Sequence, residues 1–566
     1  MPRRHVFWTL AALAVLAAGL QAWVLRWTCD DAFISFRYAQ HFAEGHGLVF
    51  NLDPAEPPVE GYTNFSWTMW LALGLQLGCS GEALLAWSVA WGIAAHVGTV
   101  LLLAAIAWRA SGGRAVVPVA ACGYAAVHHA ASLAPAGLET ALFVLLVTAM
   151  LRFCFALRCA REAWLLGFLG VLAAMTRPDG AVPVAMAGLF VAYDALRRGA
   201  PRLLVGYVVP FLVVFVPYLL WRHAYYGHWV PNTFFAKSGD DPFVSAGWAY
   251  LAGFFGCYWP LLLPFVPLAV FTVQKPDLLA TISPFLGRRP WLAIGAFVGS
   301  YLAFVLWVGG DFMFGRFVLP ILPTLLLALD FACQRWRAVW LGPLLAAVVV
   351  VGCTFRVEPP GLGNPQLDVS DNRTISFNEV WPGITFIDAF RAGGNYLRPL
   401  FAGLDVRIAI AGGHANVAFR SRVPVAVECA AGLTDAYIAR LPVPVRGKRG
   451  HDKPRDPAYL ERRGVHFMLE TNYRTEDAWR TVALPAPPFG FGMQLVTWDR
   501  DLMRELKRRE PGLVAQDFES FLDAYLADLP NKGKDQVRAD YAKFTPFYFA
   551  GNDDPVRRAA FETFLR

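Results

Sequence analysis

Long apolar stretches separated by short polar connections make up the first two-thirds of the chain. A helix of about 20 apolar residues crosses a hydrocarbon core of roughly 30 Å. The pattern predicts eleven membrane-spanning helices, over residues 6–27, 82–108, 115–134, 138–157, 163–175, 180–196, 202–222, 248–273, 291–308, 316–332 and 338–355. We therefore expect a polytopic α-helical transmembrane domain over residues 1–355 and a soluble domain over residues 356–566.

The last third of the chain has a different pattern. Short apolar runs at 406–410, 423–427 and 465–469 are typical of strands, and helical stretches lie between them. This alternation predicts an α/β unit. The pair Gly412-Gly413 is too short for a dinucleotide-binding fingerprint.

Basic residues fall in alternate connections between the predicted spans. These connections carry Arg3/Arg4, Arg109/Arg114, Arg158/Arg161, Arg197/Arg198/Arg202, Lys275/Arg288/Arg289 and Arg335/Arg337. An excess of Lys and Arg marks cytoplasmic loops, so we place the N-terminus on the cytoplasmic side of the membrane and the soluble domain on the opposite side. The short apolar run at 65–77 is then an interfacial or re-entrant helix, because a further span would invert every later loop.

The unusual polar motifs all fall on the opposite, outer side. They are Cys29-Asp30-Asp31, Glu60-Gly61-Tyr62-Thr63-Asn64, Gly137-Leu138-Glu139-Thr140, Thr176-Arg177-Pro178-Asp179-Gly180, Pro231-Asn232-Thr233-Phe234-Phe235-Ala236-Lys237 and Gly309-Gly310-Asp311. Outer loops from distant parts of the chain can build one site, so we expect an extracytoplasmic active site.

Asp30 and Asp31 open a predicted amphipathic helix at the membrane surface. A carboxylate there can take a proton from a sugar hydroxyl that attacks an anomeric carbon. The alternative is that one of the two acids only caps the helix. Two outer-face acids would also suit a divalent cation, which prefers oxygen ligands, and the sequence indicates no other cofactor.

Five further polar residues are candidates for substrate binding. Glu60 and Asn64 precede the short helix at 65–77, and Glu139 opens a span. The alternatives are capping by Asn64 and, for Glu139, a favourable interaction with the helix dipole. Arg177 and Asp179 are the other two. Arg177 would lie at membrane depth and therefore needs an acidic partner, either Asp179 or a lipid phosphate, so it is also a candidate to bind the donor phosphate.

The long outer loop and the last motif add four candidates. Asn232 lies in a loop of some 25 residues, a length that often has a function. Lys237 and Arg316 are placed to bind a departing phosphate, with interfacial snorkelling as the alternative. Asp311 follows two glycines that allow close approach of a ligand, or it simply belongs to a turn.

Composition excludes several other classes of protein. Hydrophobic residues make up 56% and charged residues 16% of the chain, so a soluble globular protein is excluded. The net charge of +7 comes from short clusters between apolar stretches and indicates topology, not nucleic-acid binding. No Walker A loop follows a strand, and the apolar stretches are nearly free of acids, which argues against an ATP-driven pump or a proton-coupled transporter.

Taken in order, these motifs resemble those of the bacterial GT-C glycosyltransferases related to the mycobacterial terminal β-1,2-arabinofuranosyltransferase. The resemblance starts at Cys-Asp-Asp-Ala-Phe-Ile-Ser-Phe-Arg-Tyr-Ala (29–39) and runs through the five later motifs. It continues as Ala-Gly-Leu-Thr-Asp at 431–435 and Gly-His-Asp-Lys-Pro at 450–454, and so covers about residues 28–470.

The resemblance implies a GT-C fold and a polyprenyl-phosphate-linked arabinofuranose donor, with Asp30 and Asp31 in the active site. The acceptor would be a cell-envelope glycan or glycoprotein. Two other classes stay open at this stage, a transporter of lipid-linked glycans and a non-catalytic assembly factor. A transporter needs inverted repeats, which the sequence does not indicate.

Overall fold

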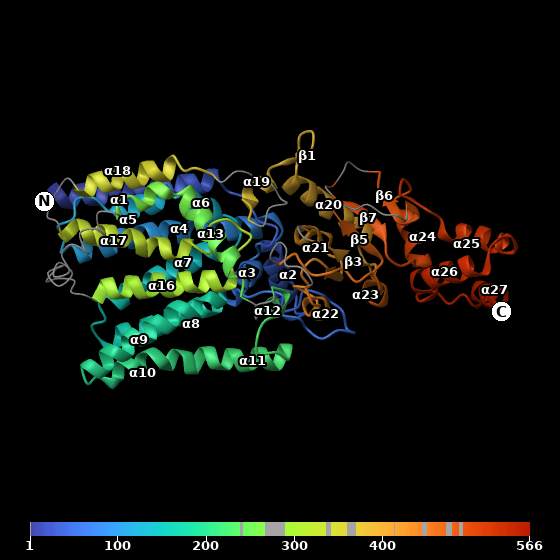
Figure 1. Cartoon of the computed structure of the whole chain (residues 1–566), viewed down its shortest axis with the longest axis horizontal. Helices are drawn as coiled ribbons and strands as arrows, with labels where there is room; N and C mark the ends of the chain where they lie inside the picture. Colours follow the sequence, from blue (N-terminus) through green and yellow to red (C-terminus); the bar gives the residue numbers. More distant parts are fainter. Residues whose placement is uncertain are drawn as a thin grey trace. The chain divides into compact units, whose positions relative to one another are not determined.

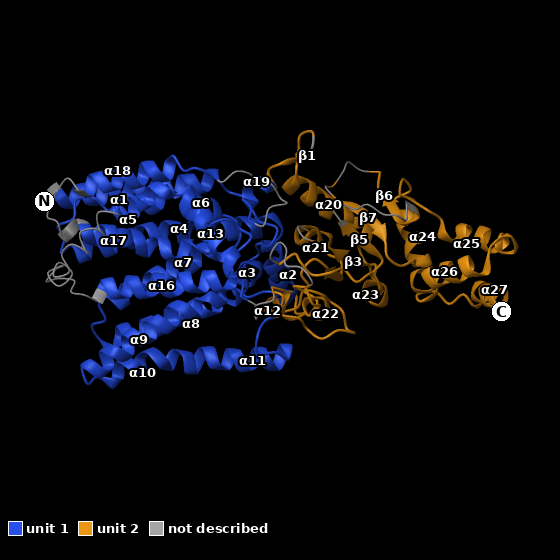
Figure 2. Ribbon diagram, in the orientation of Figure 1, with its two compact units in different colours: residues 1–43, 62–231, 238–375 blue, residues 44–61, 232–237, 376–566 orange. Residues whose placement is uncertain are grey.

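The computed structural model describes residues 2–237, 242–265, 289–335, 341–358, 369–411, 414–443, 450–470, 478–485, 489 and 491–566. The chain forms two compact units (Figure 2). Unit 1 contains residues 1–43, 62–231 and 238–375, and unit 2 contains residues 44–61, 232–237 and 376–566. Two segments from the predicted transmembrane part of the sequence, 44–61 and 232–237, therefore pack with the C-terminal residues.

Some of the predicted features lie outside the described residues. They are Lys275, Arg288, Arg337 and the pair Gly412-Gly413, together with parts of the predicted spans 248–273 and 338–355.

Unit 1 is helical, and its long helices run side by side in Figure 1. Its described elements are α1 (Pro2–Val24), α2 (Ala32–Ala43), α3 (Phe65–Gln76), α4 (Glu82–Ala110), α5 (Val119–Ala126), α6 (His128–Leu133), α7 (Thr140–Phe155), α8 (Ala160–Thr176), η1 (Pro178–Gly180), α9 (Ala181–Arg197), α10 (Pro201–Pro210), η2 (Phe211–Phe215), α11 (Val216–Tyr226), α13 (Val244–Cys257), η3 (Trp259–Leu262), α16 (Arg289–Val308), η4 (Leu319–Ile321), α17 (Leu322–Arg335), α18 (Leu341–Thr354) and α19 (Asn372–Ser376), which ends one residue into unit 2.

Five of these helical stretches are long and apolar enough to cross a membrane. They are Arg3–Val24, Glu82–Ala110, Pro178–Arg197, Pro201–Tyr226 and Pro290–Val308. Four shorter apolar helices accompany them, at Thr140–Phe155, Val244–Cys257, Leu319–Ala332 and Gly342–Thr354. Unit 1 is thus the membrane part of an integral membrane protein, and the count of eleven spans stays a prediction.

The predicted continuous helix over 115–134 is interrupted. It starts only at Val119 and breaks at Val127, whose backbone is extended, so that α5 and α6 replace one helix. The break is compensated at His129, whose backbone N–H and ring Nδ1 both contact the hydroxyl of Tyr258, at 3.3 and 2.6 Å. A side chain distant in sequence therefore replaces a helical hydrogen bond, which the apolar pattern cannot reveal.

Of the two short helices, α3 agrees with its sequence prediction and α2 agrees only in part. α3 has 12 residues and is about 18 Å long, too short to cross a hydrocarbon core, as the sequence predicted. α2 has the predicted start but not the predicted polar surface, because Arg37, Gln40 and His41 are all buried. The amphipathic pattern of α2 therefore reflects polar contacts inside the protein and not a solvent-exposed side.

Unit 2 is built on a six-stranded mixed sheet with strand order β4-β3-β5-β7-β6-β8. Its strands are β3 (Arg407–Ile410), β4 (Val425–Glu428), β5 (Phe467–Glu470), β6 (Thr481–Ala483), β7 (Gly492–Leu495) and β8 (Val514–Ala515), and a separate hairpin pairs β1 (Glu379–Trp381) with β2 (Ile384–Thr385). β3 pairs in parallel with β4 and β5, and these are the three strands that the sequence predicted. The described helices of the unit are α12 (Asn232–Ala236), α20 (Phe386–Phe401), α21 (Ala415–Ser421), α22 (Ala436–Ala439), α23 (Pro457–Arg462), α24 (Arg500–Arg509), α25 (Phe518–Ala527), α26 (Lys534–Phe544) and α27 (Pro555–Leu565), with the short elements η5 (Ala478–Arg480), η6 (Leu529–Asn531) and η7 (Thr545–Phe549).

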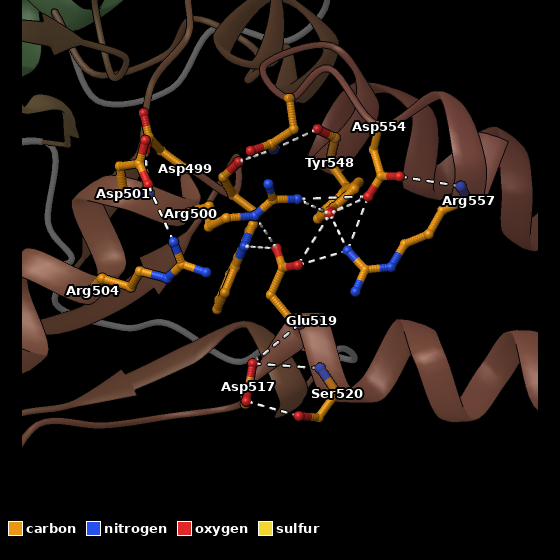
Figure 3. A network of polar contacts seen from close by, with 12 residues as sticks. Asp499, Arg500, Asp501, Arg504, Asp517, Glu519, Ser520, Tyr548, Asp554 and Arg557 are labelled. Atoms are coloured by element: carbon orange, nitrogen blue, oxygen red, sulfur yellow. Dashed lines mark hydrogen bonds and ion pairs between the residues drawn. The ribbon is translucent and has the colours of Figure 1, made fainter.

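An ion-pair network joins the C-terminal helices of unit 2 (Figure 3). Glu519 of α25 accepts hydrogen bonds from Arg500 at 3.1 Å and from Arg557 at 2.6 Å. Arg557 also pairs with Asp554 at 2.9 Å, and the hydroxyl of Tyr548 donates to the same carboxylate at 2.8 Å. One arginine thus connects the start of α27 to α25.

Candidate active site

Arg177 is a buried cation of unit 1 that is paired with two carboxylates. It follows α8 directly, and its Nε and Nη2 donate to the two carboxylate oxygens of Asp179 at 2.9 and 3.2 Å. Its Nη1 donates to Glu139 Oε1 at 3.2 Å, and the residue is only 4% exposed. The hydroxyl of Tyr301, on α16, donates to Asp179 as well. Pairing of this kind offsets the cost of removing an arginine from water.

Arg316 reaches the same acid from another part of the chain. Its Nη2 donates to Glu139 Oε1 at 2.8 Å, and its Nη1 approaches Asp311 Oδ2 at 3.5 Å. Among the described residues no group accepts a hydrogen bond from its Nε, which is buried. Its side chain is 13% exposed, compared with 5% for Arg177. Arg316 therefore keeps an unused donor and is the less tightly held of the two cations.

Asn64 connects Glu139 to α2 and α3. Its amide donates to Glu139 Oε2 at 2.9 Å, while its carbonyl oxygen accepts from Ser35 at 3.0 Å and from Thr68 at 3.1 Å. Asn64 precedes α3, but its side chain makes no capping hydrogen bond. The capping alternative for Asn64 is therefore excluded.

Glu139 occupies the corresponding position before α7, and its side chain also makes no capping hydrogen bond. Its two carboxylate oxygens are instead used by Arg177, Arg316 and Asn64. Glu139 is the residue at which three of the sequence motifs meet.

The start of α2 is fixed against the segment before Glu139. The backbone N–H of Cys29 donates to the carbonyl of Ala136 at 2.8 Å. Gly137 has φ +82°, and a Cβ there would lie 2.9 Å from Cβ of Ala32 and 3.0 Å from Cγ2 of Thr28. Only glycine combines that backbone conformation with such a close approach.

Asp31 immediately precedes α2, and its carboxylate is unused. It is one helical turn before Ser35, the residue that contacts Asn64. Burial and Asp31 raise the pKa of the Cys29 thiol while Arg316 lowers it, so both charged groups lie within electrostatic reach of Cys29. Within the described ranges the Asp31 carboxylate has no hydrogen-bond partner or ion pair, so it is not a helix cap. Both Asp30 and Asp31 are partly exposed.

Unit 1 therefore brings together six of the predicted residues directly, and Asp30 and Asp31 lie in the same unit, immediately before α2. The six are Asn64, Glu139, Arg177, Asp179, Asp311 and Arg316. Sequence reasoning missed Ser35, Thr68 and Tyr301. Ser35 had a detectable signal, because it follows Asp31 by four residues on a predicted helix. Tyr301 is a single polar residue in an apolar stretch, and no signal in the sequence indicates its role.

The remaining three predicted residues belong to unit 2. The backbone N–H of Asn232 donates to the carbonyl of Glu60 at 3.1 Å. The side-chain amide of Asn232 donates to the carbonyls of Gly432, Leu433 and Asp435, at 2.7, 3.0 and 3.3 Å. Through these contacts Asn232 fixes the backbone of the 432–435 turn. Lys237 follows α12 and is exposed.

Neither unit offers an evident metal site in its described part. There, no three His, Cys, Asp or Glu side chains lie close enough together to hold a metal ion.

Comparison with known proteins identifies relatives by sequence. The chain is 31% identical over 361 residues to the terminal beta-(1->2)-arabinofuranosyltransferase of Mycobacterium tuberculosis, covering 58% of this chain and 55% of that protein. It is 29% identical over 382 residues to the enzyme of the same name from Corynebacterium glutamicum, covering 61% and 54%. The predicted resemblance is thereby confirmed. The chain spans about half the length of the curated relatives it matches, and it matches no protein-family profile.

The fold has a solved counterpart. The crystal structure of ArnT from Cupriavidus metallidurans bound to undecaprenyl phosphate matches with a TM-score of 0.51 and 15% sequence identity, covering 87% of this chain and 98% of that one. At this identity the match shows the fold alone. The chain thus has the GT-C fold of membrane glycosyltransferases.

Proposed function

We propose that this protein is a membrane glycosyltransferase that transfers arabinofuranose from a polyprenyl-phosphate donor to a cell-envelope glycan or glycoprotein on the extracytoplasmic side of the bacterial inner membrane. The observation that carries the proposal is the network in which Arg177 and Arg316 share Glu139, which Asn64 links to Ser35, one helical turn after the unused carboxylate of Asp31. The sequence relatives are named for arabinofuranose transfer, and the structural counterpart binds a polyprenyl phosphate.

The chemistry requires a base and a fixed cation. An acceptor hydroxyl attacks the anomeric carbon of the donor sugar, a new C–O bond forms, and the bond from that carbon to the phosphate oxygen breaks. Asp31 takes the proton of the attacking hydroxyl, and Asp30 orients or supports it. The negative charge that develops on the departing polyprenyl phosphate interacts with Arg316, whose Nε is an unused buried donor.

Arg177 and Asp311 act through Arg316 in this proposal. Asp311 and Glu139 both contact the Arg316 guanidinium, and Arg177, which pairs with Asp179, also contacts Glu139. Such support keeps a binding group within the narrow geometric range that transition-state stabilisation requires. Glu60, Asn232 and Lys237 of unit 2 are proposed to contact or shape the acceptor side of the reaction.

The experiment is a transfer assay with the purified full-length protein in lipid nanodiscs. The substrates are polyprenyl-phosphoryl arabinofuranose and an arabinofuranose oligosaccharide. We expect the oligosaccharide to gain one pentose by mass spectrometry while free polyprenyl phosphate appears in equal amount. A transporter would move the donor without cleaving it, and an assembly factor would do neither. Transfer from a polyprenyl-phospho-hexose but none from the arabinofuranose donor would overturn the sugar assignment.

A further inference from the structure

Unit 2 contains a pocket that is separate from the ion-pair network of unit 1. Its volume is about 300 Å³, at the lower end of the range for small-ligand pockets. It is lined by residues between 46 and 59, by the turn at 434–436 and by Arg463. All of these segments belong to unit 2. Thr434 and Asp435 of this turn belong to the Ala-Gly-Leu-Thr-Asp motif at 431–435.

The two walls of the pocket are joined by Arg463, whose side chain is 10% exposed. Arg463 donates to Asp53 at 3.0 Å and to Asp435 at 2.7 Å, and the side chains of these acids are 1% and 2% exposed. Asp53 also accepts from Arg407 at 3.1 Å, while Asp435 accepts from the hydroxyl of Tyr459 at 2.7 Å. The pocket is therefore formed by fixed side chains.

The turn that carries Thr434 is held through its backbone on both sides. Glu428 accepts from the N–H groups of Ala430 at 2.7 Å and Leu433 at 3.0 Å, and Asn232 donates to three carbonyls of the same turn. Gly432 has φ +73°, and a Cβ there would lie 2.2 Å from the backbone nitrogen of Ala439. These constraints fix Thr434 in the pocket wall.

Two polar groups of the lining have unused hydrogen-bonding capacity. Thr434 is 4% exposed, and its buried hydroxyl has no partner in the part of the chain that the structure describes. The side-chain oxygen of Asn51 accepts from the backbone N–H of Ala426 at 2.9 Å, whereas its amide nitrogen donates to no described group. A buried polar group without a partner costs stability, so such a group in a pocket indicates a ligand that supplies the missing bond.

The charges of the lining select the chemistry of that ligand. Three carboxylates, those of Asp53, Glu56 and Asp435, and one guanidinium, that of Arg463, line the pocket, and Arg407 pairs with Asp53 from outside the lining, so one negative charge is left over. An excess of negative charge disfavours phosphate and other anions. Pro54 and the neighbouring prolines of the lining add rigid apolar surface, which suits the C–H face of a sugar ring, while amide and hydroxyl groups suit its hydroxyls.

We propose that this pocket binds a neutral sugar residue of the acceptor glycan, with Thr434 and Asn51 as hydrogen-bonding residues. That this sugar belongs to the acceptor rests on the proposed function. That the pocket binds a neutral sugar follows from its lining residues alone. The anionic donor and the neutral acceptor are thus recognised by groups of different charge in different units.

The test measures binding without turnover. The full-length protein in nanodiscs is titrated with a short arabinofuranose oligosaccharide, methylated at its reducing end, and affinity is measured by calorimetry in the absence of donor. Thr434→Val keeps the shape of the side chain and removes only the hydroxyl. We expect it to weaken affinity about tenfold, while the unfolding temperature stays the same or rises because an unpaired buried hydroxyl has been removed. Asn51→Asp keeps the oxygen that accepts from Ala426 and should also weaken binding.

Thr481→Val is the matched control, because it makes the same change at an exposed position of β6 away from the pocket. It should bind the oligosaccharide as the wild type does. Unchanged affinity in Thr434→Val and Asn51→Asp, or wild-type protein that binds no neutral oligosaccharide, would overturn the pocket assignment. Wild-type protein that binds the oligosaccharide but transfers no sugar would leave the pocket assignment intact and overturn the proposed function.

Discussion

Replacing Arg177 and Arg316 in turn by glutamine should show which arginine stabilises the fold and which binds the donor phosphate. Arg177 makes a two-pronged contact with Asp179 and a third contact with Glu139, at 2.9 to 3.2 Å, and is almost completely buried. Arg177→Gln leaves Asp179 without its cation in a buried site. Removing one partner of a buried ion pair costs about 3–5 kcal/mol, so we expect a marked fall in unfolding temperature.

Arg316→Gln should have the opposite profile. Its side chain is more exposed, its contact with Asp311 is long at 3.5 Å, and Glu139 keeps Arg177 as a partner. A hydrogen bond to a charged group contributes about 1.5–3 kcal/mol, which corresponds to roughly a 10- to 100-fold change in affinity. We expect the lower end of this range for the donor, because Glu139 and Asp311 offset part of the charge that Arg316 offers to a phosphate.

The assay compares unfolding temperature and the Kd for polyprenyl phosphate in the same nanodisc preparations. Arg391→Gln is the control, since Arg391 pairs with Asp388 at 2.6 Å and both side chains are about half exposed, at 51% and 47%. An exposed pair contributes at most about 1 kcal/mol, so this variant should change neither quantity appreciably. Two results together would refute the assignment. In one, Arg177→Gln binds polyprenyl phosphate more weakly but keeps the wild-type unfolding temperature. In the other, folded Arg316→Gln binds polyprenyl phosphate with the wild-type Kd.

Three further predictions concern topology, packing and pH. A reporter fused at Arg198 should be active only in the cytoplasm and one fused at the C-terminus only outside it, and the reverse pattern would invalidate the orientation. Gly137→Ala should lower both turnover and unfolding temperature, because φ +82° and the approach of Ala32 leave no room for a methyl group; a variant with wild-type values for both would contradict this account. Burial raises the pKa of Glu519 and of Asp554, but hydrogen bonds from Arg557 and its neighbours outweigh burial and lower both pKa values below the usual range. The stability from these acids is present above their ordinary pKa of about 4 and is lost as the pH falls through the lowered values, so hydrogen exchange in α25 and α27 should rise more than in β3 as the pH falls below about 4.

The sequence predicted the parts of the fold that depend on local pattern. The short helix at 65–77 and the strands β3, β4 and β5 lie where apolar periodicity placed them. The break at Val127 was missed, because it depends on the hydroxyl of Tyr258, which is distant in sequence. The burial of Arg37 on α2 was missed for a similar reason, since an amphipathic pattern does not show whether a polar side faces water or protein.

The sequence predicted that residues from several motifs would meet, but it did not predict that some of the candidate residues belong to a different unit. Outer-loop motifs predicted that Asn64, Glu139 and Arg177 meet, and unit 1 shows these contacts. The sequence could not reveal that Asn232 would be used to hold the 432–435 turn, because that contact joins residues about 200 positions apart. The pocket around Thr434 was also beyond sequence reasoning, since it requires the loop at 46–59 to pack beside that turn.

The central claim is that Asp31 serves the reaction and not the fold. Its carboxylate caps no helix and pairs with no described group, so Asp31→Asn should keep the wild-type unfolding temperature. The decisive measurement is the initial rate of polyprenyl-phosphate release per folded molecule, with the arabinofuranose donor and an oligosaccharide acceptor. The account predicts that Asp31→Asn lowers this rate by about 100-fold or more, the scale of a lost acid–base group. A folded Asp31→Asn protein that releases polyprenyl phosphate at the wild-type rate would contradict it.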